Sequence, residues 1–287
     1  MSANLLRTPQ RCGAWSQSWT KGKAMKKTIG IIGGGNMGEA IFLACRKRFS
    51  VHLAEKCLKR QKHLHQKHNV RIHDLDSLVK KSSILILAVK PQDFDEVLGS
   101  LKDLVKKHHL IVSIAAGITT KYIEKRLSKC PRVIRTMPNL PAVIGQGVTA
   151  VSQGAYASKN DLKVACGIFE NLGKVLVVEE KLINAVTATS GSGPGYVYFL
   201  MEQMVEAARK AGLTEAMATH LVVETFLGSV NLLKAHGATP RELREKVTSK
   251  GGTTHAALEV FSKKKMGAIF HHAMKAAVKR AHQLSRR

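Results

Sequence analysis

Three glycines near the N-terminus, Gly33, Gly35 and Gly38, fit the pattern G-x-G-x-x-G. They follow the β-branched run 29–32, which predicts a buried strand, and they precede the apolar segment 40–45, which predicts a helix. At such a turn the backbone can approach a pyrophosphate closely, and the first N–H groups of the helix attract its charge. A glycine-rich turn without a ligand is the alternative, but it does not require three glycines at these offsets. The sequence therefore predicts a dinucleotide site here.

Strand and helix patterns alternate along the residues that follow. Strands are expected at 29–32, 51–54, 70–72, 84–89, 110–115, 133–136, 148–151 and 175–178. Such alternation is typical of an α/β fold, in which a parallel sheet carries helices on both faces. We therefore predict a Rossmann-type doubly wound sheet in a dinucleotide-binding domain over residues 26–178.

After residue 179 the strand pattern stops. Only helices are expected beyond it, at 196–211, 214–236, 240–247, 252–261 and 266–284. We place the domain boundary there and predict an all-helical domain over residues 179–287. The helices between Tyr196 and Leu233 are more apolar than a small surface domain needs. We expect them to pack against another chain, with packing inside one chain as the alternative.

The segment 1–25 stands apart from both domains because it contains no acidic residue and no apolar periodicity. An acid-free leader with arginine and serine could be a targeting peptide. We favour a disordered extension, or a start codon placed too early, because Met25 leads straight into the first strand.

The formal net charge of +26 would suit a protein that binds nucleic acid. Aromatic residues make up only 5% of the chain, however, and no basic strand with interleaved aromatics offers a stacking surface for bases. A positive field that attracts small anions explains the charge equally well. We therefore expect no nucleic acid as a partner. No apolar run approaches the roughly 20 residues of a membrane span, so no membrane is expected either.

Cysteine and histidine usage gives no sign of a disulfide framework or a metal site. The five cysteines form no C-x-x-C pair, which is typical of a reducing compartment and favours a cytoplasmic location. His63, His65 and His68 have no acidic or cysteine partner nearby, so a solvated basic helix is expected and no metal.

Three further segments lie at the carboxyl ends of expected strands, where such folds bind their ligands. The first of them is 88–91, in which Lys90 could approach a phosphate or a ribose. The small residues of 113–117 would let a flat ring lie against the backbone, and 135–141 closes a third strand. Together these segments predict one edge of a nicotinamide cofactor.

The choice between NADP and NAD depends on the end of the second strand. Glu55 lies twenty-two residues after Gly33, close to where an acid holds the ribose 2′-OH of NAD. Lys56, Lys59 and Arg60 follow at once, and a 2′-phosphate favours such cations. The basic cluster leads us to predict NADP, with NAD as the alternative.

Two more glycine-rich turns lie in the helical half. The first, 190–196, places Pro194 at a helix start, and the second, 248–254, also precedes a helix. A helix N-terminus with two glycines and several hydroxyls makes a cradle for a carboxylate. The alternative is plain N-capping by Ser249 or Thr253, which would not require the pair of glycines.

With these motifs in this order, the chain from about residue 26 to its C-terminus resembles the pyrroline-5-carboxylate reductase family, which catalyses the last step of proline biosynthesis. The resemblance rests on Gly33-Gly34-Gly35-Asn36-Met37-Gly38, Ala88-Val89-Lys90-Pro91, Ser113-Ile114-Ala115-Ala116-Gly117, Arg135-Thr136-Met137-Pro138-Asn139, Ser190-Gly191-Ser192-Gly193-Pro194 and Ser249-Lys250-Gly251-Gly252-Thr253-Thr254. It implies NAD(P)H-dependent reduction of 1-pyrroline-5-carboxylate to L-proline, by hydride transfer to the cyclic imine. It also implies a helical domain that interlocks with a second subunit, and homodimers that often assemble into decamers.

The resemblance further implies the roles of single residues. Thr254 would hydrogen-bond the ring nitrogen of the substrate, and Lys56 would contact the ribose phosphate of the cofactor. The substrate would also be bound by Ser249, Gly251, Gly252, Thr253 and Glu180. The cofactor would be held by Gly33, Gly35, Asn36, Met37, Gly38, Ala88, Val89, Lys90, Pro91, Ala115, Ala116, Gly117 and Asn139.

The chain departs from the family pattern at three positions. Lys250 replaces the usual proline, Gly237 stands where many members have glutamate, and Glu55 replaces a small polar residue. Lys250 leaves open how the turn at 248–254 holds the substrate, and Gly237 leaves open any role of the glutamate side chain. The third leaves the preference between NADPH and NADH open.

Two other functions are compatible with parts of the sequence. A β-hydroxyacid dehydrogenase shares a similar cofactor fold, but it needs a lysine on the long central helix. The run from Gly193 to Arg209 contains none, and Lys210 comes only at its far end. A non-catalytic scaffold would bind NADP without turnover.

Overall fold

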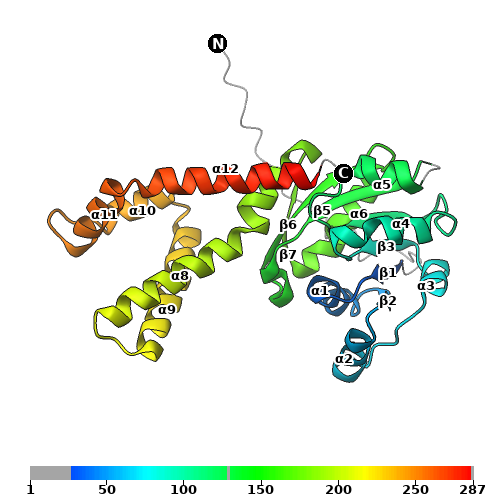
Figure 1. Ribbon diagram of the computed structural model, residues 1–287, viewed down its shortest axis with the longest axis horizontal. Coiled ribbons are helices and arrows are strands. Elements are labelled where there is room, and N and C mark those ends of the chain that lie inside the picture. Colours follow the sequence, from blue (N-terminus) through cyan, green and yellow to red (C-terminus); the bar gives the residue numbers. More distant parts are fainter. Residues whose placement is uncertain (1–26, 128–129, 286–287) are drawn as a thin grey trace, which may run out of the picture. The chain divides into compact units, whose positions relative to one another are not determined.

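The computed structural model describes residues 27–127 and 130–285 (Figure 1). The extension expected at 1–25 lies outside this range. The chain divides into two compact units, one reaching to Ser192 and including the stretch from Val278 onward, and the other spanning Gly193–Ala277. Strands end at Val177, and the domain boundary placed at residue 179 stays a prediction.

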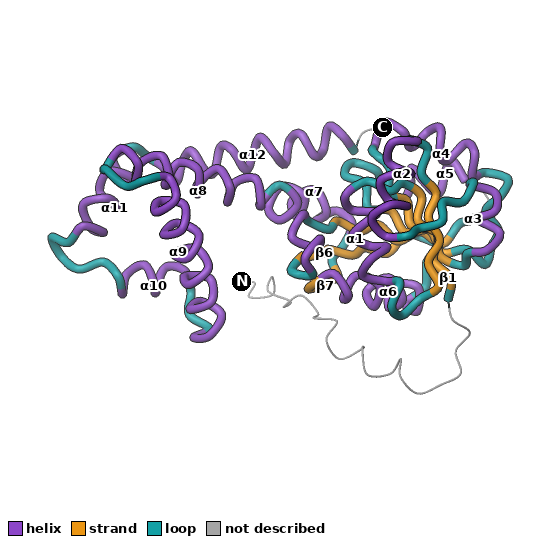
Figure 2. Tube along the Cα trace, turned by 90° about the horizontal axis from the view of Figure 1, so that it is seen from below, coloured by secondary structure: helices purple, strands orange, loops and turns teal. Residues whose placement is uncertain are grey.

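The first unit is built on one seven-stranded sheet in the order β2-β1-β3-β4-β5-β6-β7. Its strands are orange in Figure 2. Its strands are β1 (Thr28–Ile32), β2 (Ser50–Ala54), β3 (Ile84–Leu87), β4 (Leu110–Ser113), β5 (Arg132–Met137), β6 (Gly147–Gln153) and β7 (Gly173–Val177). The central strands β3 and β4 are buried along their whole length, as their continuous apolar sequences require. The doubly wound α/β fold expected from the alternating pattern is confirmed.

Two local expectations about the sheet are wrong. The sheet is not wholly parallel, because β6 pairs with β5 in antiparallel register, for example Thr136 with Val151. The link between them holds only the short 3-10 turn η4 (Leu140–Ile144), which is too short for the crossover that a parallel pair needs. The strand expected at 70–72 is reduced to one isolated bridge, from Ile72 to Leu53.

Helices cover both faces of the sheet. They are α1 (Asn36–Cys45), α2 (Leu58–His68), α3 (Leu75–Lys81), α4 (Phe94–Leu101), α5 (Thr120–Leu127) and α6 (Lys159–Phe169). One core packs α1 and α6 against the sheet, and Ile41 and Phe169 are buried in it. The other core packs α3, α4 and α5 against the opposite face, around Leu78, Phe94 and Ile123. Both cores hold the carboxyl ends of the strands in place, where the predicted site lies.

Short turns complete the first unit. They are η3 (Pro91–Asp93), η5 (Glu170–Leu172), η6 (Glu180–Leu182), α7 (Ile183–Val186) and the π-helical turn η7 (Thr187–Gly191). The π-helical turn ends at Gly191, inside the first glycine-rich segment of the helical half (190–196), and the next helix begins at Gly193, so Pro194 lies at a helix start as expected. Such π-helical turns are rare and often lie at functional sites.

The second unit is all helical. It contains α8 (Gly193–Lys210), α9 (Glu215–His236), α10 (Pro240–Lys246), α11 (Thr253–Lys263) and the first part of α12 (Met266–Leu284). Within the second unit only Ala218 and Val222 are buried. Large apolar side chains such as Phe199, Leu227 and Phe270 are 58%, 53% and 41% exposed. A unit with so little core of its own needs further apolar contacts.

Candidate active site

The glycine-rich turn between β1 and α1 has the geometry of a phosphate-binding turn. Gly33 adopts φ +102, and a Cβ there would lie 2.7 Å from the carbonyl oxygen of Ala88. Gly35 is the N-cap of α1, and no side chain caps the helix from that position. Apart from the adjoining backbone, no atom of the described residues lies within 4 Å of the position that a Cβ on Gly35 would take. The N–H groups of Asn36 and Met37 therefore begin an open helix N-terminus, which suits a pyrophosphate.

A cavity of about 800 Å³ opens beside this turn. Of the residues predicted to bind the cofactor, it brings together Gly33, Gly35, Lys56, Ala88, Val89 and Lys90. Residues that the sequence had not assigned to the site also line it, among them Gln61, His73, Asp93 and Glu96. They come from the segments after β2 and β3 and from α4. An elongated ligand that starts at the glycine turn can thus extend between β2 and α4.

The end of β2 is fixed to the glycine turn by Glu55. Its Oε2 accepts a hydrogen bond from the Gly34 N–H at 2.7 Å, and its Oε1 accepts one from the Cys57 N–H at 2.8 Å. The adjacent Lys56 is paired with two carboxylates of the far wall, Asp93 at 3.2 Å and Glu96 at 3.3 Å. The hydrogen bond to Asp93, followed by that to Glu96, raises the pKa of Lys56.

Helix α2 is held against the same turn by Arg60. Its Nε donates to the Gly34 carbonyl oxygen at 2.6 Å, and its guanidinium also pairs with Glu39 of α1. His68 and Lys67 contact the same carboxylate, at 2.6 and 3.2 Å. Desolvation, the largest effect, raises the pKa of Glu39, but the hydrogen bonds from His68, Lys67 and Arg60 outweigh it and lower the pKa to about 2. Glu39 is therefore a fixed negative charge that orients α2 over the glycine turn.

The loop after β4, which is expected to lie along the nicotinamide, packs against the end of α12. Gly117 adopts φ +79, and a Cβ there would lie 2.6 Å from the Cβ of Leu284. Leu284 is the last residue of α12, and this end of the helix belongs to the first unit. The preceding Ala115 is buried. The cavity described above does not include the Ala115–Gly117 loop, nor Pro91 or Asn139, among its described lining residues.

Asn139 has a structural contact in the described chain. Its Oδ1 accepts a hydrogen bond from the Val148 N–H at 2.8 Å, which ties the start of η4 to β6. Its predicted role in binding the cofactor stays a prediction. The same holds for Pro91, which begins η3 at the carboxyl end of β3.

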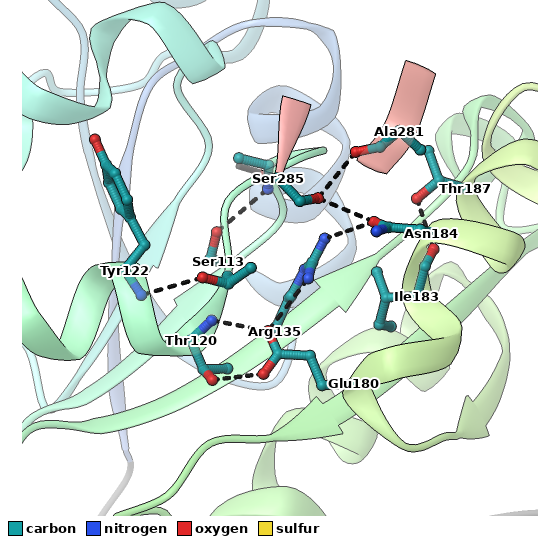
Figure 3. Close-up of polar contacts among 12 residues, drawn as sticks. Ser113, Thr120, Tyr122, Arg135, Glu180, Ile183, Asn184, Thr187, Ala281 and Ser285 are labelled. Carbon is teal, nitrogen blue, oxygen red and sulfur yellow. Dashed lines mark hydrogen bonds and ion pairs between the residues drawn. The ribbon is translucent and has the colours of Figure 1, made fainter. Parts of the chain in front are cut away.

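Glu180, expected near the substrate, is engaged inside the first unit (Figure 3). Its carboxylate accepts hydrogen bonds from Thr120 and lies 3.2 Å from Nη1 of Arg135. Arg135 is only 2% exposed, and its Nε has no hydrogen-bond partner among the residues that the structure describes. Burial, the largest effect, lowers the pKa of Arg135, and the charge of Glu180 opposes this shift. This pair was not predicted, because the two residues lie far apart in the chain.

The same cluster extends to the end of α12. Asn184 Nδ2 donates to Nδ1 of His282 at 3.0 Å, and the Ser285 hydroxyl donates to Asn184 Oδ1 at 3.1 Å. Arg135 reaches the same Asn184 oxygen at 3.5 Å (Figure 3). The end of α12 and the residue that follows it are thereby attached to the segment that carries Glu180.

The glycine-rich turn before α11 lies in the second unit. Gly252 is the N-cap of α11, without a side-chain hydrogen bond, so capping by Ser249 or Thr253 is not what this turn provides. Gly251 adopts φ +73, and the Gly252 N–H donates to the Ser249 carbonyl oxygen at 3.1 Å. Thr253 and Thr254 form the first turn of α11. The open N–H groups at this helix start suit a small carboxylate.

Gly237, one of the departures from the family pattern, has a clear conformational role. It closes α9 with φ +62, in the left-handed region. A glutamate at this position would be strained there, because residues with a Cβ seldom adopt this conformation. Lys250 is exposed in the turn before α11.

Comparison with known proteins identifies the family. A family model described as pyrroline-5-carboxylate reductase dimerisation matches residues 180–284, and one described as NADP oxidoreductase, coenzyme F420-dependent, matches residues 28–117. A pyrroline-5-carboxylate reductase of Synechocystis is 36% identical over 269 residues, which cover 92% of this chain and 100% of that protein. The chain belongs to the pyrroline-5-carboxylate reductase family. The resemblance inferred from the motifs is confirmed.

Solved structures of pyrroline-5-carboxylate reductases share the fold. The protein from Coxiella burnetii is 32% identical, with a TM-score of 0.82, over 92% of this chain and 100% of that one. The Plasmodium falciparum pyrroline carboxylate reductase, solved with NADP bound, is 24% identical, with a TM-score of 0.83, over 91% of this chain and 100% of that one. Both alignments include the helical half as well as the sheet.

Family membership also bears on α9, which is long and apolar enough to cross a membrane by length and composition alone. The core helix of a soluble protein passes the same test, so this property is weak evidence for a membrane. Helix α9 lies within the matched dimerisation region, residues 180–284. Its exposed side chains, such as Leu221 and Leu227, therefore have a second subunit as the expected partner.

Proposed function

We propose that this protein reduces 1-pyrroline-5-carboxylate to L-proline with a reduced nicotinamide dinucleotide. The observation that carries the proposal is the 36% identity to the Synechocystis pyrroline-5-carboxylate reductase along that protein's whole length. The protein is an oxidoreductase of this family, and its first unit is an NADP-binding domain. The lysine that a β-hydroxyacid dehydrogenase needs on its central helix is missing from 193–209 of α8.

The residues of the first unit fit the cofactor. The open N-terminus of α1 at Gly35 offers N–H groups to the pyrophosphate, and a Cβ on Gly33 would collide with Ala88. Lys56, Lys90 and the cavity beside them would take the adenosine ribose. When bound, the nicotinamide supplies the hydride that goes to C5 of the imine. The Ala115–Gly117 loop would support the nicotinamide ring.

The second unit would hold the substrate. The uncapped start of α11, at Gly251 and Gly252, would receive the carboxylate, with Ser249 and Thr253 as hydroxyl donors. The Thr254 hydroxyl would donate a hydrogen bond to the imine nitrogen, which gains a proton as C5 gains the hydride. That proton would come from solvent or from a substrate already protonated. The main contribution of these residues would be to fix the distance and angle between the donor and acceptor carbons.

The assembly belongs to the same proposal. The match to a dimerisation model and the exposed apolar side chains of α8, α9 and α12 support a homodimer, and we extend this to the decamers suggested by the family resemblance. Cys45, Cys57 and Cys130 form no disulfide among the described residues, which supports a cytoplasmic location. Light scattering during gel filtration distinguishes a dimer from a decamer.

The activity is tested with the purified full-length chain. Addition of 1-pyrroline-5-carboxylate should oxidise NADPH or NADH, which is measured as the loss of absorbance of the reduced cofactor. Mass spectrometry should detect an equal amount of proline. Cofactor binding without oxidation would instead favour a non-catalytic scaffold and would refute the proposed reaction.

A further inference from the structure

The cavity of the first unit has a charge that contrasts with the rest of the chain. The protein carries a formal net charge of +26. The charged side chains that line the cavity are nevertheless mostly acidic: Glu55, Asp74, Asp93 and Glu96, against Lys56 and Lys90. An enzyme that depends on the extra phosphate of NADP would be expected to place cations here.

Glu55 occupies the decisive position in this cavity. It follows β2 directly, at the place in a dinucleotide fold where an acidic side chain reaches the 2′-hydroxyl of the adenosine ribose. Backbone N–H groups of Gly34 and Cys57, at 2.7 and 2.8 Å, hold one carboxylate oxygen each. A carboxylate has about four acceptor sites, so it can still accept a hydrogen bond from a ribose hydroxyl while it remains fixed.

Two of the cations that could compensate this charge are already in use. Lys56 lies between Asp93 and Glu96, and Arg60 is bound to the Gly34 carbonyl oxygen and to Glu39. A 2′-phosphate carries about two negative charges at neutral pH. Binding it here would bring these charges close to Glu55 and would require Lys56 to leave its two partners.

We propose that Glu55 is a specificity-determining residue that favours the 2′-hydroxyl of NAD(H) and disfavours the 2′-phosphate of NADP(H), so that this enzyme discriminates less in favour of NADPH than a site with a neutral amide at this position. The inference rests on the proposed function, because it concerns the adenosine end of the cofactor. It gives NADH a role in the reaction of a protein whose first unit is an NADP-binding domain.

The test compares two fragments that differ only in the 2′-phosphate. Calorimetric titration of the full-length wild type and of E55N with 5′-AMP and with 2′,5′-ADP measures binding without turnover. E55N should raise the affinity for 2′,5′-ADP relative to 5′-AMP by about tenfold. The substitution removes a charge-assisted hydrogen bond to the 2′-hydroxyl of 5′-AMP, and it also removes the charge that repels the 2′-phosphate of 2′,5′-ADP. The ratio of kcat/KM for NADPH over NADH should rise by a similar factor.

D74N is the matched control. Asp74 lines the same cavity, but its carboxylate caps α3 by accepting from the Ser77 N–H at 2.7 Å, and asparagine caps a helix equally well. D74N removes the same charge and should shift the affinity ratio by no more than about twofold. A shift as large as that of E55N would overturn the proposal, because the net charge of the cavity would then suffice.

Two further results would overturn it. The first is an unchanged affinity ratio in E55N and in E55Q, which keeps the length of the side chain should E55N be unstable. The second is an equal loss of affinity for both fragments in E55N and E55Q, which would show that Glu55 only holds the glycine turn. In either case 1-pyrroline-5-carboxylate reduction by the wild type would leave the proposed function intact. Wild-type protein that bound neither fragment would contradict both.

Discussion

The carboxylate of Glu180 accepts two hydrogen bonds from Thr120, one from the backbone N–H at 2.8 Å and one from the Oγ1 hydroxyl at 2.6 Å. The same carboxylate balances the charge of Arg135, which is 2% exposed. One glutamate thus joins the start of α5, the carboxyl end of β5 and the turn η6. It connects the last part of the first unit to the sheet.

Replacing this glutamate should destabilise the protein. In E180Q the buried guanidinium of Arg135 loses its counterion, so the free energy of unfolding should fall by about 2–3 kcal/mol. Urea denaturation measures the change. E179Q is the control, because Glu179 pairs with Lys181 at the surface, where both side chains are more than 70% exposed. If E180Q kept its stability but raised the KM for the substrate, Glu180 would serve in substrate binding, as the family resemblance implies.

Gly33→Ala should damage both stability and cofactor binding. The residue has φ +102, and the new Cβ would lie 2.7 Å from the Ala88 carbonyl oxygen, so the turn must shift. We expect a loss of about 1–3 kcal/mol in the free energy of unfolding and a clear loss of affinity for NADP. Gly99→Ala, in α4 with nothing within 4 Å of its Cβ position, should instead be neutral or slightly stabilising. Equal effects of both variants would show that the geometry of the turn is unimportant.

The contribution of Glu39 should depend on pH in a defined range. Its folded-state pKa of about 2 lies below the ordinary value of 4.5, so its stabilising effect is complete above that ordinary value and is lost as the pH falls toward the folded pKa. The stability difference between wild type and E39Q should therefore shrink from pH 4.5 to pH 2. Urea denaturation at several pH values measures it.

D76N provides the comparison for this series. Asp76 pairs with Lys80 along α3, and its side chain is 50% exposed. It should change stability little at any of these pH values, because exposed pairs contribute little. A stability difference between wild type and E39Q that stayed constant down to pH 2 would contradict the pairing of Glu39 with the basic side chains of α2.

Thr254→Ala should lower turnover and leave cofactor affinity nearly intact. The first turn of α11 presents this hydroxyl next to the uncapped Gly252. Loss of a hydrogen bond made at the reacting nitrogen should reduce kcat by about tenfold to a hundredfold. Thr254→Ser retains the hydroxyl and should restore most of the activity. Normal turnover by the alanine variant would remove Thr254 from the mechanism.

Local patterns were sufficient to predict most of the first unit. The strands around β1, β3 and β4 and the helix α2 follow from short-range composition, and the glycine offsets predicted the turn at Gly33. The antiparallel β6 was missed, because strand direction depends on the length and path of a link that carries no periodic signal. The segment 70–72 has strand-like residues but too little length to form a ladder.

Contacts between distant segments explain what could not be predicted at the site. Glu180 was identified only as a family position, and its pairing with Arg135 depends on where η6 meets the sheet. The role of Lys56 in cofactor binding was predicted from its charge and its place in the family pattern. Its partners Asp93 and Glu96 come from a different βα segment. Neither contact produces a pattern that can be recognised within a short stretch of the sequence.

The packing of Leu284 against Gly117 has a consequence for how the chain is made. A ribosome has produced every strand of the described sheet once Val177 is complete, but Leu284, which covers the loop after β4, follows only after α8, α9, α10 and α11 have been made. The nascent first unit must therefore wait with this loop uncovered while these helices are made, and termination of translation before Leu284 would leave the loop uncovered despite an intact set of strands.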